Sequence, residues 1–530
     1  MKYKITTLAI LVGIFFSAGA CKKQDNDMEA LPVSKDGYYQ EPHRPQFHFS
    51  PDSMWMNDPN GMVYYEGEYH LFYQYHPYST VWGPMHWGHA VSTDLVHWQH
   101  LPIALYPDKL GLIFSGSAVV DWNNTSGFGQ EGKPPLIAIF THHLMEGEKA
   151  GRNDFQYQSI AYSLDKGRTW TKYEGNPVIP NPGIRDFRDP KVFWHEPTQH
   201  WIMIFAAADQ VKIYSSPGLK DWRHESDFGR GIGAHGGVWE CPDLFELPVD
   251  RNEENKKWVM LVSINPGAPN GGSGTQYFVG SFDGSQFTLE EGYTQQLSAG
   301  RPAYWLDYGR DNYAGVTWSD IPEEDGRRLF IGWMSNWSYA NIVPTERWRS
   351  AMTVARTLEL QQTPQGLRVY SNPVQELQSI LDEVQEIPPQ EVSSRINLSS
   401  QLKEASSTLD IYLELEWPED AAPTAVAVVL SNSKGESVHV GLKPSAGQFF
   451  IDRRNPFEAV HLAPRENPSN KTQLRLLVDV SSVELFADGG KVVMTDLFFP
   501  NEDFTKAELV VEGDGVKVVE GSIAGVDSIW

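Results

Sequence analysis

Cysteine is almost absent from this 530-residue sequence, which contains only Cys21 and Cys241. No Cys/His cluster has the spacing of zinc ligands, and no glycine-rich loop follows an expected strand. We therefore expect no metal and no nucleotide cofactor. If Cys21 is modified, no intrachain disulfide can form, and stability must come from burial of a core, which a chain of this length can supply.

Basic residues are also in deficit. The chain has 43 Lys and Arg against 68 Asp and Glu, a formal net charge of -25 at pH 7. An acidic surface repels phosphate backbones, which argues against nucleic acid as a partner, and nothing indicates a partner protein. Aromatic residues, by contrast, reach 12%, with 18 Trp. Their flat faces serve both core packing and stacking against sugar rings.

An apolar run over residues 5–16 is too short to span a bilayer. Two lysines precede it, and small residues and then Cys21 follow it, which is the layout of a secretory signal and is typical of a bacterial lipoprotein. We therefore expect a signal peptide over residues 1–20 and a flexible tether over residues 21–38. The protein would be lipid-anchored to the bacterial envelope through Cys21, on the periplasmic face or at the cell surface. Ordinary secretion with a chance cysteine is the alternative.

A recurring pattern of a strand ending in Ser, a polar turn and an aromatic residue occurs at 92–98, 163–170, 216–222 and 281–287. The starts are separated by 71, 53 and 65 residues, close to what a four-stranded propeller blade with loops requires. Each turn is predicted to join two outer strands of a blade. We predict a five-bladed β-propeller over residues 39–370; a β-sandwich is the alternative, but it does not explain the repeat.

The rest of the chain predicts a second domain. Residues 371–390 form a linker with a short helix, because Val374, Leu377, Ile380 and Leu381 share one helical face. Beyond it, apolar residues alternate along 409–416, and strands over 474–486 and 491–498 are expected to form a hairpin. The predicted fold class is all-β, with the propeller followed by a C-terminal antiparallel β-sandwich over residues 391–530.

Three carboxylates stand where strands are expected to begin: Asp58 in Trp-Met-Asn-Asp-Pro-Asn-Gly, Asp189 in Arg-Asp-Pro and Glu240 in Glu-Cys-Pro. Each alone fits a structural role, as a turn residue, a local ion pair or a loop acid. On the first strands of three blades, however, they would converge on the central channel. Two carboxylates flanking a glycosidic bond are what its hydrolysis requires.

These three motifs together resemble the signature sequences of glycoside hydrolase family 32, the invertase, inulinase and levanase family. The resemblance continues at 73–75, 82–90, 114–117, 307–314 and 478–486, and so covers nearly the whole mature chain. It implies a retaining β-fructofuranosidase with Asp58 as nucleophile, Glu240 as acid/base and Asp189 holding the fructosyl hydroxyls. It also implies a fructose pocket lined by Asn57, Gln74, Trp82, Phe114, Ser115 and Arg188.

The segment 333–352 resembles fructan-degrading members more than sucrose-specific ones. Within it, Trp333 and Trp337 are candidate sugar platforms, with core packing as the alternative; Trp333 is included in the predicted site. We therefore predict hydrolysis of levan or inulin, and of sucrose, with fructose released from the chain end. An endo-acting enzyme, a non-catalytic carbohydrate-binding lipoprotein and a sialidase-like propeller are the alternatives. The last would need an arginine cluster and a tyrosine nucleophile, which the sequence does not indicate.

Overall fold

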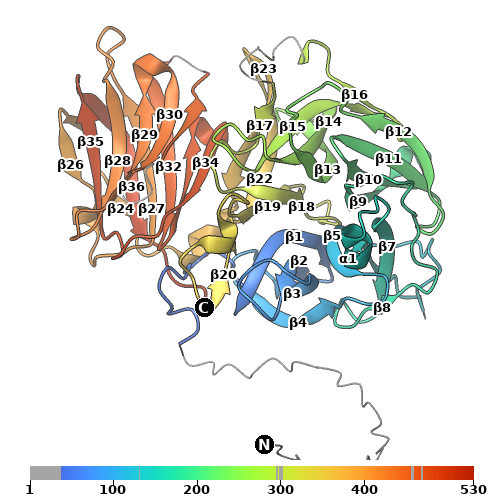
Figure 1. The fold of residues 1–530 in the computed structure, drawn as a ribbon. Helices are drawn as coiled ribbons and strands as arrows, with labels where there is room; N and C mark the ends of the chain where they lie inside the picture. The colour runs from blue at the N-terminus through green and yellow to red at the C-terminus, as the bar shows by residue number, and fades with distance from the viewer. Residues whose placement is uncertain (1–36, 131, 294–296, 298–301, 455–458, 467–468) are drawn as a thin grey trace, which may run out of the picture. The chain divides into compact units, whose positions relative to one another are not determined.

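The computed structural model describes residues 37–130, 132–293, 297, 302–454, 459–466 and 469–530. Residues 1–20, Cys21 and most of the expected tether lie outside them. Strands make up most of the secondary structure (Figure 1). In the described part of the chain, no helix is long and apolar enough to cross a membrane.

The predicted propeller is built from antiparallel units of four strands each (Figure 1). Their innermost strands, β1, β5, β9, β13 and β18, contact one another in that order, and β18 contacts β1, so the ring closes. The units are β1 (Met54–Tyr65), β2 (Glu68–His76), β3 (His86–Ser92) and β4 (Gln99–Leu105); β5 (Leu112–Val120), β6 (Leu136–His143), β7 (Gln156–Ser163) and β8 (Thr171–Lys172); β9 (Phe187–His195), β10 (His200–Ala207), β11 (Gln210–Ser216) and β12 (Arg223–Phe228); β13 (Val238–Val249), β14 (Asn252–Asn265), β15 (Gly274–Phe282) and β16 (Phe287–Leu289); and β18 (Tyr313–Thr317), β19 (Arg328–Met334), β22 (Arg356–Thr363) and β23 (Gly366–Pro373).

The recurring serine turns join the third and fourth strands of the first four units, as the spacing predicts. The hydroxyls of Ser92, Ser163 and Ser216 accept backbone N–H groups of the turns that follow them, at 2.8–2.9 Å. The indole N–H groups of Trp170 and Trp222 then donate to carbonyls of the same turns. The repeat therefore marks the turn at which one strand ends and the next begins. Shorter elements complete this part: α1 (Met145–Lys149), η1 (Glu196–Thr198), η2 (Ala340–Ile342), β17 (Tyr304–Trp305), β20 (Trp348–Arg349) and β21 (Ala351–Met352).

The C-terminal part is the predicted antiparallel sandwich. One sheet has the order β24–β36–β27–β32–β33–β34, with β25 also on β36, and the other has the order β26–β35–β28–β29–β30–β31. The alternating residues Leu409, Ile411, Leu413 and Leu415 lie in the core. The elements are η3 (Gln375–Ile380), β24 (Gln385–Glu386), β25 (Gln390–Val392), β26 (Arg395–Asn397), η4 (Ser399–Gln401), β27 (Leu409–Glu416), β28 (Ala425–Ser431), β29 (Ser437–Lys443), η5 (Pro444–Ala446), β30 (Gln448–Arg453), β31 (Val460–Pro464), β32 (Lys471–Asp479), β33 (Ser482–Ala487), η6 (Asp488–Gly490), β34 (Val492–Leu497), β35 (Lys506–Glu512) and β36 (Val516–Gly525).

Two local expectations differ from the structure. The linker helix is only the 3₁₀ helix η3, and β24 already pairs with the sandwich strand β36 inside the expected linker, as β25 does from the linker's last residue onward. The strand expected over 474–486 is two strands, β32 and β33, because the chain turns between Asp479 and Ser482. The hairpin around residues 488–490 is present as β33 and β34.

That turn lets Asp479 bind the segment that leads into the propeller. Its carboxylate accepts the backbone N–H groups of Gln46, Phe47 and His48. The His48 ring lies between Asp479 and Glu484, at 2.8 and 2.7 Å, and Glu484 also accepts from the Arg356 guanidinium. The sandwich motif 478–486 is therefore a buried ionic attachment to the propeller.

This attachment predicts a pH dependence of stability. Burial by itself would lower the pKa of His48, but Asp479 and Glu484 outweigh it and raise the pKa from 6.5 to about 9. A pKa that folding raises gives stabilisation that is complete below about pH 6.5 and is lost as the pH rises through about 9. We expect the free energy of unfolding to fall across that interval, and His48→Gln to be less stable at pH 6 with a flatter fall. Denaturant unfolding at a series of pH values measures both. The exposed His97→Gln is the control, and an unchanged slope in His48→Gln would contradict the account.

Candidate active site

The innermost strands are interrupted where the sequence motifs fall. The ladder of β1 on β2 shifts register between Met56 and Pro59, and that of β13 on β14 shifts between Glu240 and Asp243. The ladders of β5, β9 and β18 shift at 113–116, 188–191 and 313–316. A bulge re-aims side chains, and proline has no N–H to give to the ladder, so Asp-Pro and Cys-Pro suit these places. The interruptions turn polar side chains of different strands toward one centre.

A cavity of about 240 Å³ lies at this centre and contains all three predicted acids. Asp58 comes from β1, Asp189 from β9 and Glu240 from β13. The predicted residues that line it are Asn57, Asp58, Gln74, Trp82, Phe114, Ser115, Arg188, Asp189 and Glu240. Trp337, named above as a candidate sugar platform, also lines it, as do five residues that were not predicted: His143, Glu148, Phe155, Gln156 and Asp186.

Trp333 is the one predicted pocket residue that the structure places elsewhere. Its side chain is fully buried and packs between the rings of Trp55 and Trp337, with centroids 6.2 and 4.9 Å away. It lies on β19 in the propeller core, so the prediction of a sugar platform at this position is wrong. Trp337, four residues later in the loop that follows, lines the cavity instead.

Asp58 is held by hydroxyl and amide donors. Its Oδ2 accepts from Ser115 Oγ at 2.6 Å and its Oδ1 accepts from Asn57 Nδ2 at 3.0 Å. The Cys241 thiol lies 3.7 Å from the same Oδ2. Burial raises the pKa of Asp58; the Ser115 hydrogen bond opposes this rise, and the negative charge of Glu240 adds to it. The two side-chain donors fix the carboxylate in one orientation.

Asp189 is almost completely buried and takes a left-handed backbone conformation, with φ of 67°. Its N–H donates to Thr141 Oγ1 at 3.0 Å, and its Oδ2 accepts the N–H of Cys241 at 3.1 Å. Burial raises the pKa of Asp189 to about 7, which Arg188 opposes and the neighbouring carboxylates reinforce. A carboxyl in this setting can exchange hydrogen bonds with ligand hydroxyls in either protonation state.

Glu240 is positioned by two donors from two other strands. Arg188 donates to Oε1 from Nε at 3.2 Å and from Nη2 at 2.9 Å, and the Tyr313 hydroxyl donates to Oε2. Tyr313 lies in β18, inside a motif that the sequence singled out without assigning it a role. With Ser115 on β5, each innermost strand contributes a group to this cluster.

A hydrogen-bond chain that sequence reasoning missed continues from Arg188 toward the rim. Gln156 Oε1 accepts from Arg188, and Gln156 Nε2 lies 3.1 Å from the ring nitrogen of His143. His143 in turn contacts Glu148 of α1 and stacks on Phe114 at 4.3 Å. Burial lowers the pKa of His143 to about 4, so the ring is neutral near pH 7. The adjacent histidines at 142–143 are the one signal in the sequence that could have pointed to it.

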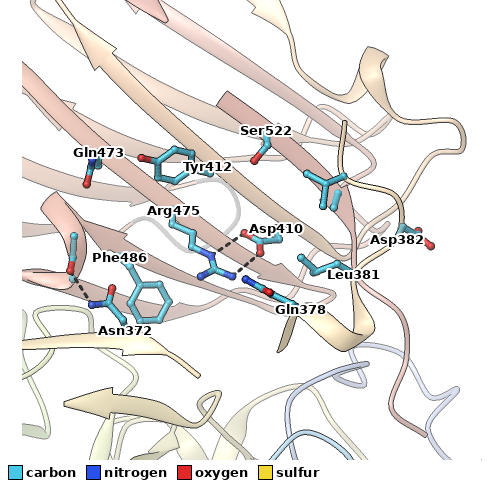
Figure 2. Close-up of a pocket in the computed structure, with 14 residues that line it drawn as sticks. Asn372, Gln378, Leu381, Asp382, Asp410, Tyr412, Gln473, Arg475, Phe486 and Ser522 are labelled. Carbon is cyan, nitrogen blue, oxygen red and sulfur yellow. Dashed lines mark hydrogen bonds and ion pairs between the residues drawn. The ribbon is translucent and has the colours of Figure 1, made fainter. Parts of the chain in front are cut away.

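A larger cavity of about 620 Å³ lies against the sandwich (Figure 2). The acidic residues that line it are Asp382 and Asp410, and both oxygens of Asp410 accept from Arg475, at 3.1 and 2.7 Å. This ion pair engages both oxygens of Asp410, and the cavity brings together only these two acids, whereas the smaller cavity brings together Asp58, Asp189 and Glu240 from three strands. The smaller cavity is therefore the candidate active site.

The chain is also similar to known families and proteins. Residues 48–373 match the "Glycosyl hydrolases family 32 N-terminal domain", and residues 376–524 match the "Glycosyl hydrolases family 32 C terminal" model. A levanase of Bacillus subtilis is 50% identical over 510 residues, covering 94% of this chain and 72% of the levanase. An extracellular exo-inulinase of Aspergillus niger is 39% identical over 523 residues, covering 93% of this chain and 96% of the inulinase.

Solved structures show the same architecture. The crystal structure of exo-inulinase from Aspergillus awamori superposes with a TM-score of 0.83 at 37% identity, over 93% of this chain and 100% of that one. A β-fructofuranosidase from Schwanniomyces occidentalis complexed with fructosyl-erythritol superposes with a TM-score of 0.78 at 33% identity, over 94% and 99% of the two chains.

The Ser115–Asp58 contact predicts a shifted pH profile. Because this hydrogen bond opposes the rise in the pKa of Asp58, Ser115→Ala should raise that pKa further. The acid limb of kcat/KM against pH should then move to higher pH, with about a tenfold loss of activity, since a hydrogen bond to a charged group is removed. Ser117→Ala, on the same strand and bound to the N–H of Val192, is the control. An acid limb at the same pH in Ser115→Ala and in the parent protein would contradict this role.

Proposed function

Because this chain belongs to glycoside hydrolase family 32, we propose that it cleaves β-fructofuranosidic bonds of levan or inulin with retention of configuration and releases fructose from the chain end. The observation that carries the proposal is the convergence of Asp58, Asp189 and Glu240 in one cavity. Sucrose, which presents the same fructosyl group, is a further substrate of the same site.

The proposed mechanism uses the three acids differently. Asp58 attacks the anomeric carbon while Glu240 gives its proton to the departing oxygen, which leaves a fructosyl group bound to Asp58. Glu240 then takes a proton from water, the water attacks the anomeric carbon, and Asp58 leaves as a carboxylate. Asp189 hydrogen-bonds the fructosyl hydroxyls, and these contacts tighten as positive charge develops on the ring.

The filled propeller channel favours action at chain ends. Lys191 and Asp243, two and three residues beyond Asp189 and Glu240 on β9 and β13, are 5% and 0% exposed, and both are bonded to Thr317. A chain therefore cannot pass through the propeller at this point. Trp82, Phe114 and Trp337, each half-buried, line the cavity and narrow it, so we expect a terminal fructosyl unit to fit the site better than an internal one. The relative from Aspergillus niger is named an exo-inulinase.

Substitution of each of the three acids should reduce activity in a different way. Asp58→Ala should lose nearly all turnover, because no covalent intermediate can form. Glu240→Ala should lose about 10²–10⁴-fold in kcat on fructans but less on fructosides with a good leaving group, which need little protonation. Asp189→Ala should damage both substrates alike. Steady-state kinetics on inulin and on an activated aryl fructoside test this. Equal losses on both substrates in Glu240→Ala would rule out its role as the acid.

Product analysis tests the exo and retaining parts of the proposal. Chromatography of the earliest products from levan and inulin should show fructose alone. In methanol-containing buffer, NMR should show methyl β-fructofuranoside, because retention passes the sugar to methanol on its original face. A ladder of oligosaccharides would favour an endo-acting enzyme, and the methyl α-anomer would show that Asp58 activates water instead of attacking the sugar.

We also propose that the mature protein begins at a lipidated Cys21 and is held at the bacterial envelope by it. The support is the charged start, the short apolar run and the small residues before the cysteine. Cys21→Ala should yield soluble protein or unprocessed precursor, and mass spectrometry of the native protein should find acyl chains on its first residue. Unchanged membrane retention of a correctly processed Cys21→Ala protein would refute the anchor.

A further inference from the structure

A third cavity, of about 340 Å³, lies at the end of the propeller channel opposite the active-site cavity. Its lining includes Val119, Phe193 and Leu244, each four residues beyond a site residue, namely Ser115, Asp189 and Glu240, on β5, β9 and β13. Four residues of strand span about 13 Å. The buried Lys191–Asp243 pair also lines this cavity, and its members lie two and three residues beyond Asp189 and Glu240 on the same strands. The two cavities therefore open at opposite ends of one filled channel.

Aromatic side chains dominate the lining of this distal cavity: Trp122, Phe193, Trp194, Trp201, Phe245 and Trp258. Trp122 is 59% exposed, which is unusual for so large an apolar ring. Its indole N–H donates to Asp320 at 2.8 Å, so the ring is held in place while its surface stays open to solvent. A fixed, exposed aromatic face is a platform on which a sugar ring can stack.

The polar groups beside these rings can form hydrogen bonds with the hydroxyl groups of a ligand. Arg328 stacks on Phe245 at 5.1 Å, and its guanidinium makes no hydrogen bond or ion pair with any described residue. The exposed Glu246 offers an acceptor in the same lining. The charged residues of the lining are Lys191, Arg328, Asp243, Glu246 and Asp320. Their charges nearly cancel, which disfavours an anionic ligand and fits a neutral polyol.

We infer that this distal cavity is a second saccharide-binding site, which holds a neutral fructan chain by stacking on Trp122 and by hydrogen bonds to Arg328 and Glu246. The inference rests on the proposed function, because a polymeric substrate is what gives an enzyme use for a site remote from its chemistry. Binding there would keep the polymer near the enzyme after each fructose is released.

The test uses the full chain with Asp58→Asn, which should not turn over substrate. Its retardation in native gels containing levan or inulin measures binding to the polymer, and saturating free fructose fills the catalytic cavity. We expect retardation to persist in fructose. Trp122→Ala in this background should weaken that residual binding by about three- to tenfold, since an aromatic contact is lost. Tyr106→Ala, another exposed aromatic residue that lines neither cavity, should bind as the parent does.

The outcomes separate this site from the proposed function. Complete loss of retardation in fructose, or equal retardation of Trp122→Ala and the parent, would overturn the distal site while leaving fructan hydrolysis intact. Hydrolysis of levan and inulin by the protein with Asp58 present is measured independently. If that protein cleaves neither polymer, the proposed function fails whatever the gels show. Arg328→Gln provides a second variant, and it should reduce residual binding in the same direction as Trp122→Ala.

Discussion

The catalytic cavity depends on a backbone constraint that all the innermost strands share. Each strand leaves its regular ladder where it passes the centre, and in three of them a proline follows one or two residues after the acid. A regular strand would send alternate side chains to its two faces, and a shift in the ladder re-aims the side chains beside it. The interruptions bring Asp58, Asp189 and Glu240 together from β1, β9 and β13. The closed ring of strands keeps these positions fixed.

Clustering three acids is unfavourable unless donors surround them, and the donors here come from several strands. Ser115 donates a hydrogen bond to Asp58, and Arg188 and Tyr313 donate to Glu240. A second buried cluster, around His48 and Glu484, attaches the sandwich to the propeller. In both places a charged side chain is stable in the interior because hydrogen-bond donors or opposite charges contact it. The sandwich therefore contributes to the stability of the scaffold that holds the cavity.

Much of the fold could be predicted from the sequence wherever a sequence pattern depends on hydrogen bonds between neighbouring residues. The serine turns mark strand ends through hydrogen bonds within a few residues, and Asp-Pro marks a break in a ladder. The helix at η3 shows the limit. Of the four residues predicted to share a helical face, Val374, Leu377 and Ile380 are buried and Leu381 is only partly buried, and the spacing of three between the buried ones is the period of a 3₁₀ helix and not of an α-helix.

Other features depend on contacts between distant parts of the chain. Trp333 and Trp337 stand in one segment and Trp55 packs beside both rings, so no local pattern shows that Trp333 is buried in the core while Trp337 lines the cavity. The chain from Arg188 through Gln156 to His143 joins strands of two units, and no spacing in the sequence indicates it.

The central claim, that the converged Asp58 becomes covalently bonded to the sugar, is tested most directly by trapping that intermediate. Glu240→Gln retains the nucleophile but cannot activate water, so an activated aryl fructoside should load the enzyme faster than the intermediate is hydrolysed. Mass spectrometry of the digested protein should then find one fructosyl group on the peptide that contains Asp58. A fructosyl group on Asp189 or on the substituted side chain at position 240, or no adduct while the aryl group is still released, would contradict the account.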